Sequence, residues 1–356
     1  MNNDKVSQEN NISIKDEDKS IKSTKILTLT YLIKASFTSL NGSDKEADNM
    51  SNIKKITMEK EQFPYASPQA LRRGIRNQLG VLGEKLSEGV ETTIAKGAAS
   101  TQRRPEEYID DDLFGYMGTE EASENAKGRS IIRASIIRIT PLVALSKYEG
   151  DLDFGTNFMS VKTGGNPNIF ETEIHSGIYR GTILIELDRV GRGDGFKKEL
   201  DNKEKARRVK VLLVAIKNLW MPGRQTRFLT DISPKFMIAA MLKTKNPIFL
   251  ESVLVEDNVI NSDILEETIK DFKNEIVSCV IGMRRGIFTI ETKDNDTKDN
   301  DTKDNDTKDN DTKDNEAKKN ETIEQGMNST GYVLQNIRTI GDAFEEMTRW
   351  TDDYYT

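Results

Sequence analysis

The sequence predicts an α+β protein built on a split βαβ sheet of the ferredoxin or RRM type, enlarged by insertions. Two observations indicate this fold. Segments with apolar residues at every second position alternate with segments that have helical periodicity, and the order strand, helix, strand occurs twice. At 356 residues the chain also has ample material for a hydrophobic core once its polar tails are set aside.

The first strand and helix are predicted near the N-terminus. Residues 25–38, KILTLTYLIKASFT, alternate as a half-buried strand does, and a loop rich in Asn, Gly and Asp follows at 41–52. Ser67 is a good N-cap and Pro68 a good first helical residue, so a helix is expected over 67–86. Its buried stripe should consist of Leu71, Ile75, Leu79 and Leu82.

The remaining elements follow the same pattern. Strands are expected at 131–139 and 178–188, and a basic amphipathic helix at about 201–219. Further strands are expected at 234–242, 250–255 and 275–281, with a helix at 263–273. By periodicity alone, 234–242 also fits a helix.

Both ends of the chain carry polar low-complexity sequence. Residues 1–23 have few apolar positions and are predicted to be a disordered tail. Repeats of Thr-Lys-Asp-Asn-Asp dominate 291–322, which we interpret as a solvated linker rather than an acidic mimic of nucleic acid. Within 323–356, apolar residues recur at helical spacing, so a last helix should return and dock on the body.

Composition excludes several kinds of site. The chain has one cysteine, Cys279, and one histidine, His175, so it has no disulfide of its own and no site of several cysteines or histidines for zinc. No apolar run is long enough to cross a bilayer, and residues 1–11 lack the apolar region of a signal peptide. We expect a soluble cytoplasmic protein without a membrane partner, a cofactor or a bound metal.

The formal charge of −7 argues against a generic nucleic-acid-binding protein. Arginines and lysines nevertheless form local clusters, at 72–76, 189–198, 203–210 and 224–227 among others. A protein that is acidic overall but locally basic is expected to bind one polyanion in a defined groove.

Two of these basic clusters are the main candidates. On the helix that Ser67 begins, Arg72, Arg73 and Arg76 share an arc beside the buried stripe, where their stems can pack while their guanidinium groups face a phosphate. Gly223–Phe228 forms the second. The alternatives are an ordinary solvated charged face for the helix, a helix-turn hydrogen bond for Gln69, and surface salt bridges for Arg224 and Arg227.

Catalytic interpretations are weaker. His175 and Ser176 are adjacent on a strand and should point to opposite faces, so a structural histidine is favoured over a nucleophilic pair. The carboxylates of 110–112, Asp151 and Asp153 suit magnesium, but acidic loops are usually just solvated.

Several motifs together resemble the backbone subunit of the type I CRISPR surveillance complex Cascade, in the DevR branch of subtype I-B, within the repeat-associated RAMP superfamily. They span roughly 25–290. In chain order, they are the first strand running into Asn41-Gly-Ser-Asp44, Ser67-Pro-Gln-Ala-Leu-Arg-Arg73, Asp112-Leu-Phe-Gly-Tyr-Met117, His175-Ser-Gly-Ile-Tyr-Arg-Gly181 and Pro222-Gly-Arg-Gln-Thr-Arg-Phe228.

The resemblance implies a modified RRM palm over 24–290, with inserted fingers at about 87–130 and a β-hairpin thumb at about 154–176. Several copies would coat one guide RNA as a filament and leave its bases free to pair with target DNA, in contact with other Cascade subunits. The implied RNA-binding residues are Ser67, Gln69, Arg72, Arg73, Arg76, Arg224, Gln225 and Arg227. Phe154, Phe158 and Met159 of the thumb would wedge between bases.

Two other functions remain open. Related subunits of type III complexes cut RNA with an aspartate after the first strand, and Asp44 or Asp48 lies in the comparable region here. The DevR branch points to type I, so a non-enzyme is expected, and a metal-dependent ribonuclease is the first alternative. An RNA-free developmental regulator is the second.

Overall fold

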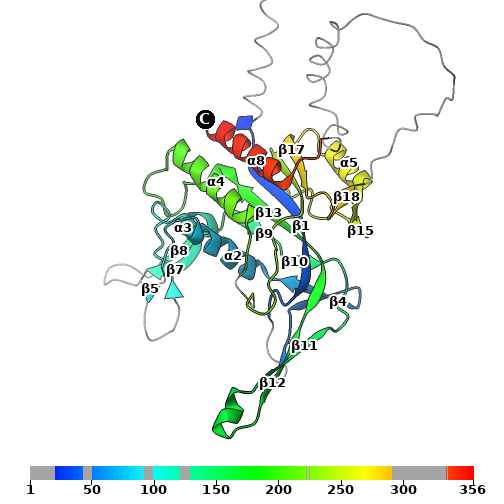
Figure 1. The fold of residues 1–356 in the computed structure, drawn as a ribbon. Coiled ribbons are helices and arrows are strands. Elements are labelled where there is room, and N and C mark those ends of the chain that lie inside the picture. The colour runs from blue at the N-terminus through cyan, green and yellow to red at the C-terminus, as the bar shows by residue number, and fades with distance from the viewer. Residues whose placement is uncertain are drawn as a thin grey trace, which may run out of the picture.

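The computed structural model describes residues 21–42, 50–88, 90–91, 99–120, 129–221, 223, 225–290, 334 and 336–356. It shows a mixed α+β fold around an eight-stranded sheet in the order β17-β14-β1-β13-β10-β4-β3, with β9 also paired to β13 (Figure 1). All these pairings are antiparallel. Residues 1–20 of the expected disordered tail and the repeat linker at 291–322 lie outside the described residues. Residues 21–23, which were predicted to belong to that tail, form a helical turn instead.

The sheet strands are β1 (Ile26–Thr38), β3 (Lys55–Met58), β4 (Glu61–Ala66), β9 (Ile137–Ile139), β10 (Leu142–Ala144), β13 (His175–Glu186), β14 (Phe236–Leu242) and β17 (Ile276–Met283). The helices are α2 (Pro68–Val81), α3 (Ile109–Phe114), α4 (Asn202–Lys217), α5 (Ser262–Asp271) and α8 (Ile340–Tyr355), and short 3-10 turns are η1 (Met159–Thr163) and η2 (Leu187–Arg189). Smaller sheets contain β2 (Met50–Ser51), β5 (Val90–Glu91), β6 (Ala99–Ser100), β7 (Tyr116–Glu120), β8 (Arg129–Arg133), β11 (Leu152–Asn157), β12 (Asn168–Glu173), β15 (Val255–Glu256), β16 (Val259–Ile260) and β18 (Thr289–Ile290).

Both faces of the large sheet are covered. Alternate residues of β1, such as Leu27, Leu29 and Ile33, pack against the apolar faces of α2, α4 and α8. The residues between them, such as Ile26 and Leu32, pack on the other side against the segment that contains α5 and β18. Burial on both sides explains why β1 is a nearly continuous apolar run.

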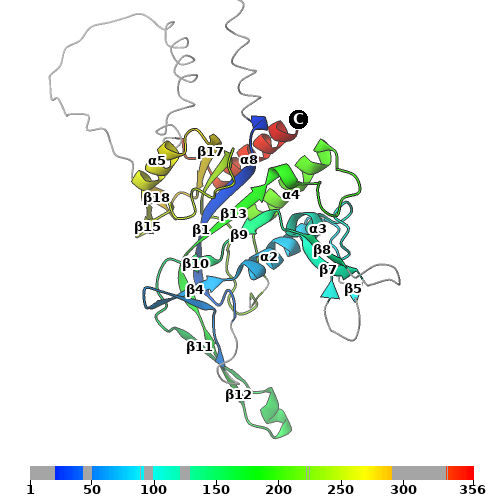
Figure 2. The same ribbon diagram turned by 180° about the vertical axis from the view of Figure 1, so that it is seen from behind.

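Two parts extend from this body. The hairpin of β11 and β12, with η1 at its tip, projects away from the sheet in both views (Figures 1 and 2). The β5–β6 and β7–β8 ribbons lie beyond α3, at the side of the body away from α5. Of the described helices, none is both long and apolar enough to cross a membrane.

Several predicted elements are confirmed, including strand 234–242 as β14 and the last helix as α8, which packs on α4 and β17. Others were wrong. The helix from Ser67 ends at Val81 instead of residue 86, because Gly83 adopts a positive φ of 88° and reverses the chain. Leu82 is therefore an exposed cap residue and not part of the buried stripe.

The predicted strand at 131–139 is interrupted, because β8 ends at Arg133 and β9 begins at Ile137 in a different sheet. Within 250–255, only Val255 enters a strand, and the preceding residues form turns. The β3–β4 hairpin was not predicted, because its exposed residues lack a clear alternation.

Candidate nucleic-acid interface

The described residues of the two predicted basic clusters lie where α2, the end of β1 and the loop after α4 meet. Gly74 lets the segment after α4 approach α2 closely, since a β-carbon at Gly74 would lie 3.1 Å from the carbonyl oxygen of Trp220. A β-carbon at Gly223 would lie 3.9 Å from the carbonyl oxygen of Leu40. Asn41 joins the same junction, because its Oδ1 accepts a 2.9 Å hydrogen bond from the Ser67 amide. Segments that are about 180 residues apart in the chain thus form one surface.

Gln69, Arg72 and Arg73 line one face of α2 at this junction, because residues three and four apart are neighbours on a helix. Arg73 and Gln69 are exposed, and Arg72 is half-buried. Within the described part of the chain, neither arginine forms an ion pair or a side-chain hydrogen bond. The Nε of Arg72 is buried without a partner there. Among the described residues of this face, Arg72 and Arg73 are therefore the cations that remain available.

Ser67 and Arg76 hold the helix in place. The Ser67 hydroxyl accepts a hydrogen bond from the Ala70 amide at 3.3 Å, and the residue is buried. Arg76 Nε donates to Asp110 Oδ2 at 2.8 Å, and its Nη2 donates to the Ser87 carbonyl at 2.6 Å. Ser67 caps the helix, and Arg76 joins it to Asp110 and to the Ser87 carbonyl. Both residues therefore have structural roles in the protein.

Gln225 closes the loop after α4. Its Nε2 donates to the Met221 carbonyl and its Oε1 accepts from the Thr230 amide, both at 2.9 Å. These two hydrogen bonds join Met221 to Thr230 and use both ends of the Gln225 amide. Arg224 lies outside the described residues.

Arg227 anchors the loop to the root of the hairpin. Its Nη2 pairs with Asp153 on β11, and its Nη1 donates to the Thr172 hydroxyl on β12 at 3.1 Å. The guanidinium also lies over the rings of Phe170 and Phe228, at 4.6 and 5.0 Å from their centroids. We call these five residues the hairpin-root cluster; in it, the charge of Arg227 is shared with a carboxylate.

The cluster continues into β1 through a bulge. The register of β1 against β13 shifts between Ala35 and Thr38, and Phe37 adopts a positive φ of 47°. Its amide donates to the Ser176 hydroxyl at 2.7 Å, and its ring meets Phe228 edge-on at 5.7 Å. The bulge thus turns Phe37 out of the sheet and onto the hairpin root.

Apolar side chains lie exposed along the hairpin. Phe154, Phe158 and Met159 are each at least 60% exposed. Exposed apolar side chains on a projecting hairpin are typical of a surface that contacts a partner. The structure brings the hairpin root into contact with the loop that carries Arg227.

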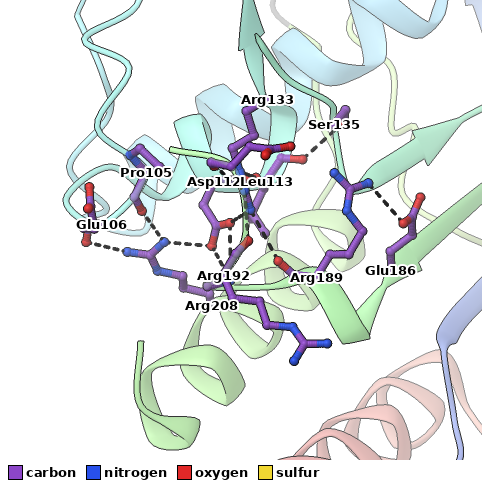
Figure 3. A network of polar contacts seen from close by, with 12 residues as sticks. Pro105, Glu106, Asp112, Leu113, Arg133, Ser135, Glu186, Arg189, Arg192 and Arg208 are labelled. Carbon is purple, nitrogen blue, oxygen red and sulfur yellow. Dashed lines mark hydrogen bonds and ion pairs between the residues drawn. The ribbon is translucent and has the colours of Figure 1, made fainter. Parts of the chain in front are cut away.

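The acidic run on α3 is part of a buried ion cluster (Figure 3). Arg208 donates to Asp112 Oδ2 at 2.8 Å, Arg133 pairs with Asp112 Oδ1, and the Gly191 amide donates to both oxygens. Burial raises the pKa of Asp112, and the guanidinium groups of Arg208 and Arg133 oppose that rise. We call Asp112, Arg133 and Arg208 the Asp112 cluster.

The neighbouring carboxylates are engaged too, since Asp111 Oδ2 accepts from the Arg104 amide at 2.9 Å and Asp110 binds Arg76 and the Ser87 amide. No group of three or more potential metal ligands occurs in the described ranges. Asp44 and Asp48 lie outside them.

His175 is buried and points away from Ser176. Its Nδ1 lies 2.9 Å from the Tyr179 hydroxyl and its Nε2 lies 3.4 Å from Ser146 Oγ, while Ser176 is exposed and bonds to Phe37. Burial lowers the pKa of His175, against the opposing charges of Asp151 and Glu149. The prediction that the two side chains face opposite sides is confirmed.

A family model described as CRISPR-associated negative auto-regulator DevR/Csa2 matches residues 29–263, which include every part of this interface. The chain belongs to the DevR/Csa2 family. A CRISPR-associated protein Cas7/Cst2/DevR of Myxococcus xanthus (strain DK1622) is 24% identical to this DevR/Csa2 chain over 223 residues, which are 59% of this chain and 70% of that protein.

Two solved structures are similar to this member of the family. One, titled CRISPR RNA-guided surveillance complex, is 13% identical with a TM-score of 0.46, over 72% of this chain and 87% of that one. The other, titled CRISPR RNA-guided surveillance complex, pre-nicking, is 8% identical with a TM-score of 0.47, over 75% and 96% of the two chains.

The partners of Arg227 were not found by sequence reasoning. Asp153 and Thr172 lie 74 and 55 residues from Arg227 in the chain, and no local pattern joins them. The only available signal was an arginine flanked by an aromatic residue in Thr226-Arg227-Phe228, which suits a stacked guanidinium as well as one that binds phosphate.

Proposed function

We propose that this DevR/Csa2 chain is the backbone subunit of a type I-B Cascade complex and binds the guide RNA along its ribose-phosphate chain. Several copies coat one guide and present its bases to target DNA for antiviral defence, in the cytoplasm and beside other Cascade subunits. One observation carries the proposal. Arg72 and Arg73 have no partner within the described residues and lie at the junction of α2, the loop 221–230 and the end of β1.

We infer that the sheet is of the ferredoxin type. The core elements β1, α2, β10, β13, α4 and β14 follow the order strand, helix, strand, strand, helix, strand. Their strands lie side by side as β14, β1, β13 and β10, all antiparallel. In this interpretation the projecting hairpin is the thumb, and the ribbons beyond α3 belong to the fingers.

Contact with the backbone suits a subunit that must accept any guide sequence. Phosphates and sugar hydroxyls carry no sequence information, and single-stranded RNA is held by cationic and stacking groups. The sheet faces are packed against helices on one side and the α5 segment on the other, so bases do not have the open sheet that an RRM offers. The exposed surface of α2 offers another route. There, the buried Arg72 Nε would gain an acceptor.

The exposed side chains on this face of α2 differ in the contacts that they offer to RNA. Arg73 is exposed and supplies a point of positive charge, while Gln69 one turn earlier supplies a neutral donor and acceptor. Arg227 would position the thumb. Its guanidinium already pairs with Asp153, so a phosphate that binds it would share the guanidinium with that carboxylate. Phe154, Phe158 and Met159 would then meet the bases.

The experiment is purification of the full chain from cells that express a CRISPR array, with the ratio of absorbance at the nucleic-acid and protein maxima. We expect RNA of uniform length, and Arg73→Ala should lose it at a lower salt concentration for every guide sequence alike. The salt slope should fall by about 0.7 for that contact on single-stranded RNA. Arg349→Ala, an exposed arginine of α8, is the matched control.

An RNA-free monomer that does not respond to added guide would contradict the proposal and favour the regulator. A loss confined to some guide sequences would contradict contact with the backbone.

We also propose that the subunit is not a nuclease. The support is that Asp110, Asp111 and Asp112 are committed to arginines and backbone amides. Filament incubated with complementary RNA and Mg²⁺ should leave the RNA intact. Site-specific cuts that Asp44→Ala abolishes would establish the metal-dependent ribonuclease instead.

A further inference from the structure

A cavity of about 580 Å³ opens beside the candidate interface, between the end of α4, the loop after Leu229, the end of β17 and the start of α8. Its floor is apolar, because the buried side chains of Leu219 and Ile340 line it. Trp220 stands at the cavity with 40% of its surface exposed. An exposed indole above an apolar floor is a surface on which a planar ring can stack.

Two cations border the same cavity. Lys217 is the last residue of α4, and Arg284 directly follows β17. Neither side chain forms an ion pair or hydrogen bond with any residue that the structure describes. Asp231, the one acidic residue among the described lining residues, pairs with Lys235 at 2.7 Å. The free charge at the cavity is therefore positive.

The walls are held in place by contacts already described and by one more. Gln225 ties Met221 to Thr230 on one side. On the other, Lys235 Nζ donates to the carbonyl and hydroxyl oxygens of Ser233 at 2.9 and 2.8 Å. The cavity is thus formed before any ligand arrives, and preorganised groups lose less entropy on binding.

The cavity and α2 share Trp220. This residue lines the cavity, and a β-carbon at Gly74, which follows Arg73 on α2, would lie 3.1 Å from the Trp220 carbonyl oxygen. A strand of nucleic acid on Arg72 and Arg73 therefore has the cavity within reach along the loop 219–230.

From these four observations we infer that the cavity is a second contact site for single-stranded nucleic acid, in which one base stacks on Trp220 and a neighbouring phosphate binds Arg284 and Lys217. An aromatic ring beside unpaired cations is the combination that single-strand binders use without regard to sequence. RNA and DNA share this chemistry. The inference rests on the proposed function, because it takes the strand from the α2 interface.

The test uses the two tryptophans of the chain. Trp350 is only 7% exposed on α8, so Trp350→Phe leaves Trp220 as the sole reporter and Trp220→Phe leaves Trp350 as the matched control. The full chain, freed of nucleic acid in high salt, is titrated with single-stranded uridine and thymidine oligonucleotides. We expect quenching of Trp220 and an unchanged Trp350 signal. The two oligonucleotides show whether RNA or DNA is preferred.

Affinity gives a second readout. Trp220→Ala should weaken binding about 5- to 150-fold, the range for loss of one stacked base. Lys217→Gln and Arg284→Gln together remove both cations from that phosphate and should lower the salt slope by about 0.7 on RNA. If bound RNA resists removal, ultraviolet crosslinking of the purified complex should place a crosslink on the peptide that contains Trp220.

Failure of this inference is distinguishable from failure of the proposed function. Binding that needs Arg73 but leaves Trp220 fluorescence, the Trp220→Ala affinity and the crosslinked peptide unchanged would overturn the second site alone. Quenching of Trp220 that depends on protein concentration, without oligonucleotide, would overturn it in favour of a second copy of the chain. Quenching that survives Arg73→Ala would support the site and contradict the α2 route.

Discussion

The Asp112 cluster joins two arginines to an aspartate and the hairpin-root cluster joins one, and the two clusters differ in what surrounds these charges. Asp112, Arg133 and Arg208 are fully buried, and each charge has hydrogen bonds from several directions. Arg227 and Asp153 are partly exposed, and two aromatic rings cover part of the guanidinium. Solvent makes the second pair weak and exchangeable. In the buried Asp112 cluster, the loss of one ion leaves its partners charged and unpaired away from solvent, so each of the three residues is needed for stability.

The largest effect is expected at the Asp112 cluster. Asp112→Ala leaves two buried guanidinium groups without their carboxylate, which should lower the free energy of unfolding by about 3–5 kcal/mol. Denaturant unfolding followed by circular dichroism measures this. A loss below about 1 kcal/mol would show that water or other groups replace the carboxylate, and would remove the contrast with Asp153.

The next effect separates two arginines of α2. Arg76→Ala removes charge-assisted bonds to the buried Asp110 and to the Ser87 carbonyl, and should cost about 1–3 kcal/mol of stability. Arg73→Ala should change stability by less than about 0.5 kcal/mol, because Arg73 is exposed and has no partner in the described residues.

Parallel unfolding curves and RNA-binding titrations of the two variants test the division. An Arg73→Ala variant as unstable as Arg76→Ala would place Arg73 among the structural residues.

A smaller effect is expected at the hairpin root. Asp153→Asn removes a partly exposed ion pair and should lower stability by about 1 kcal/mol or less. It should also loosen the hairpin, because Arg227 loses its partner on β11. Spin labels at Lys162→Cys on η1 and Lys270→Cys on α5, in a Cys279→Ser background, report the distance between hairpin and body.

We expect a broader distance distribution for Asp153→Asn than for the unmodified hairpin. Glu171→Gln is the matched control, since it removes a hairpin carboxylate for which the structure shows no contact with Arg227. Equal distributions in Asp153→Asn and Glu171→Gln would mean that Arg227 does not set the orientation of the hairpin.

The smallest effect concerns pH. His175 is the only histidine, and burial holds its folded-state pKa below the unfolded value of about 6.5. The unfolded chain therefore binds a proton first, so stability is complete above about pH 6.5 and declines as the pH falls below it.

Unfolding free energies between about pH 7.5 and 5.5 should fall in the unmodified protein and stay flatter in His175→Gln. Glu186 affects the free energy of unfolding at lower pH than His175 does. Burial alone would raise the pKa of Glu186, but hydrogen bonds from Lys245, Arg138 and Arg189 lower it to about 2. Identical slopes in the two proteins would show that His175 does not titrate in this window.

The sequence by itself determined the elements and the chemistry. Alternation in residues 25–38 and the apolar stripe of Leu71, Ile75 and Leu79 predict β1 and α2, because a periodic pattern depends only on neighbours along the chain. Ser67 and Pro68 fixed the start of α2 for the same reason. The end of that helix, the break at Ala134 and the β3–β4 hairpin were missed, since turns and weak alternation give little local signal.

Only the tertiary structure decided which charges are free. The sequence predicts the same RNA-binding role for Arg72, Arg73, Arg76 and Arg227. In the folded protein, however, Arg76 forms an ion pair with Asp110 and Arg227 forms one with Asp153. These partners lie 34 and 74 residues from the arginines that they bind. A side chain's charge is a property of its residue type, but its availability depends on which distant group lies beside it after folding.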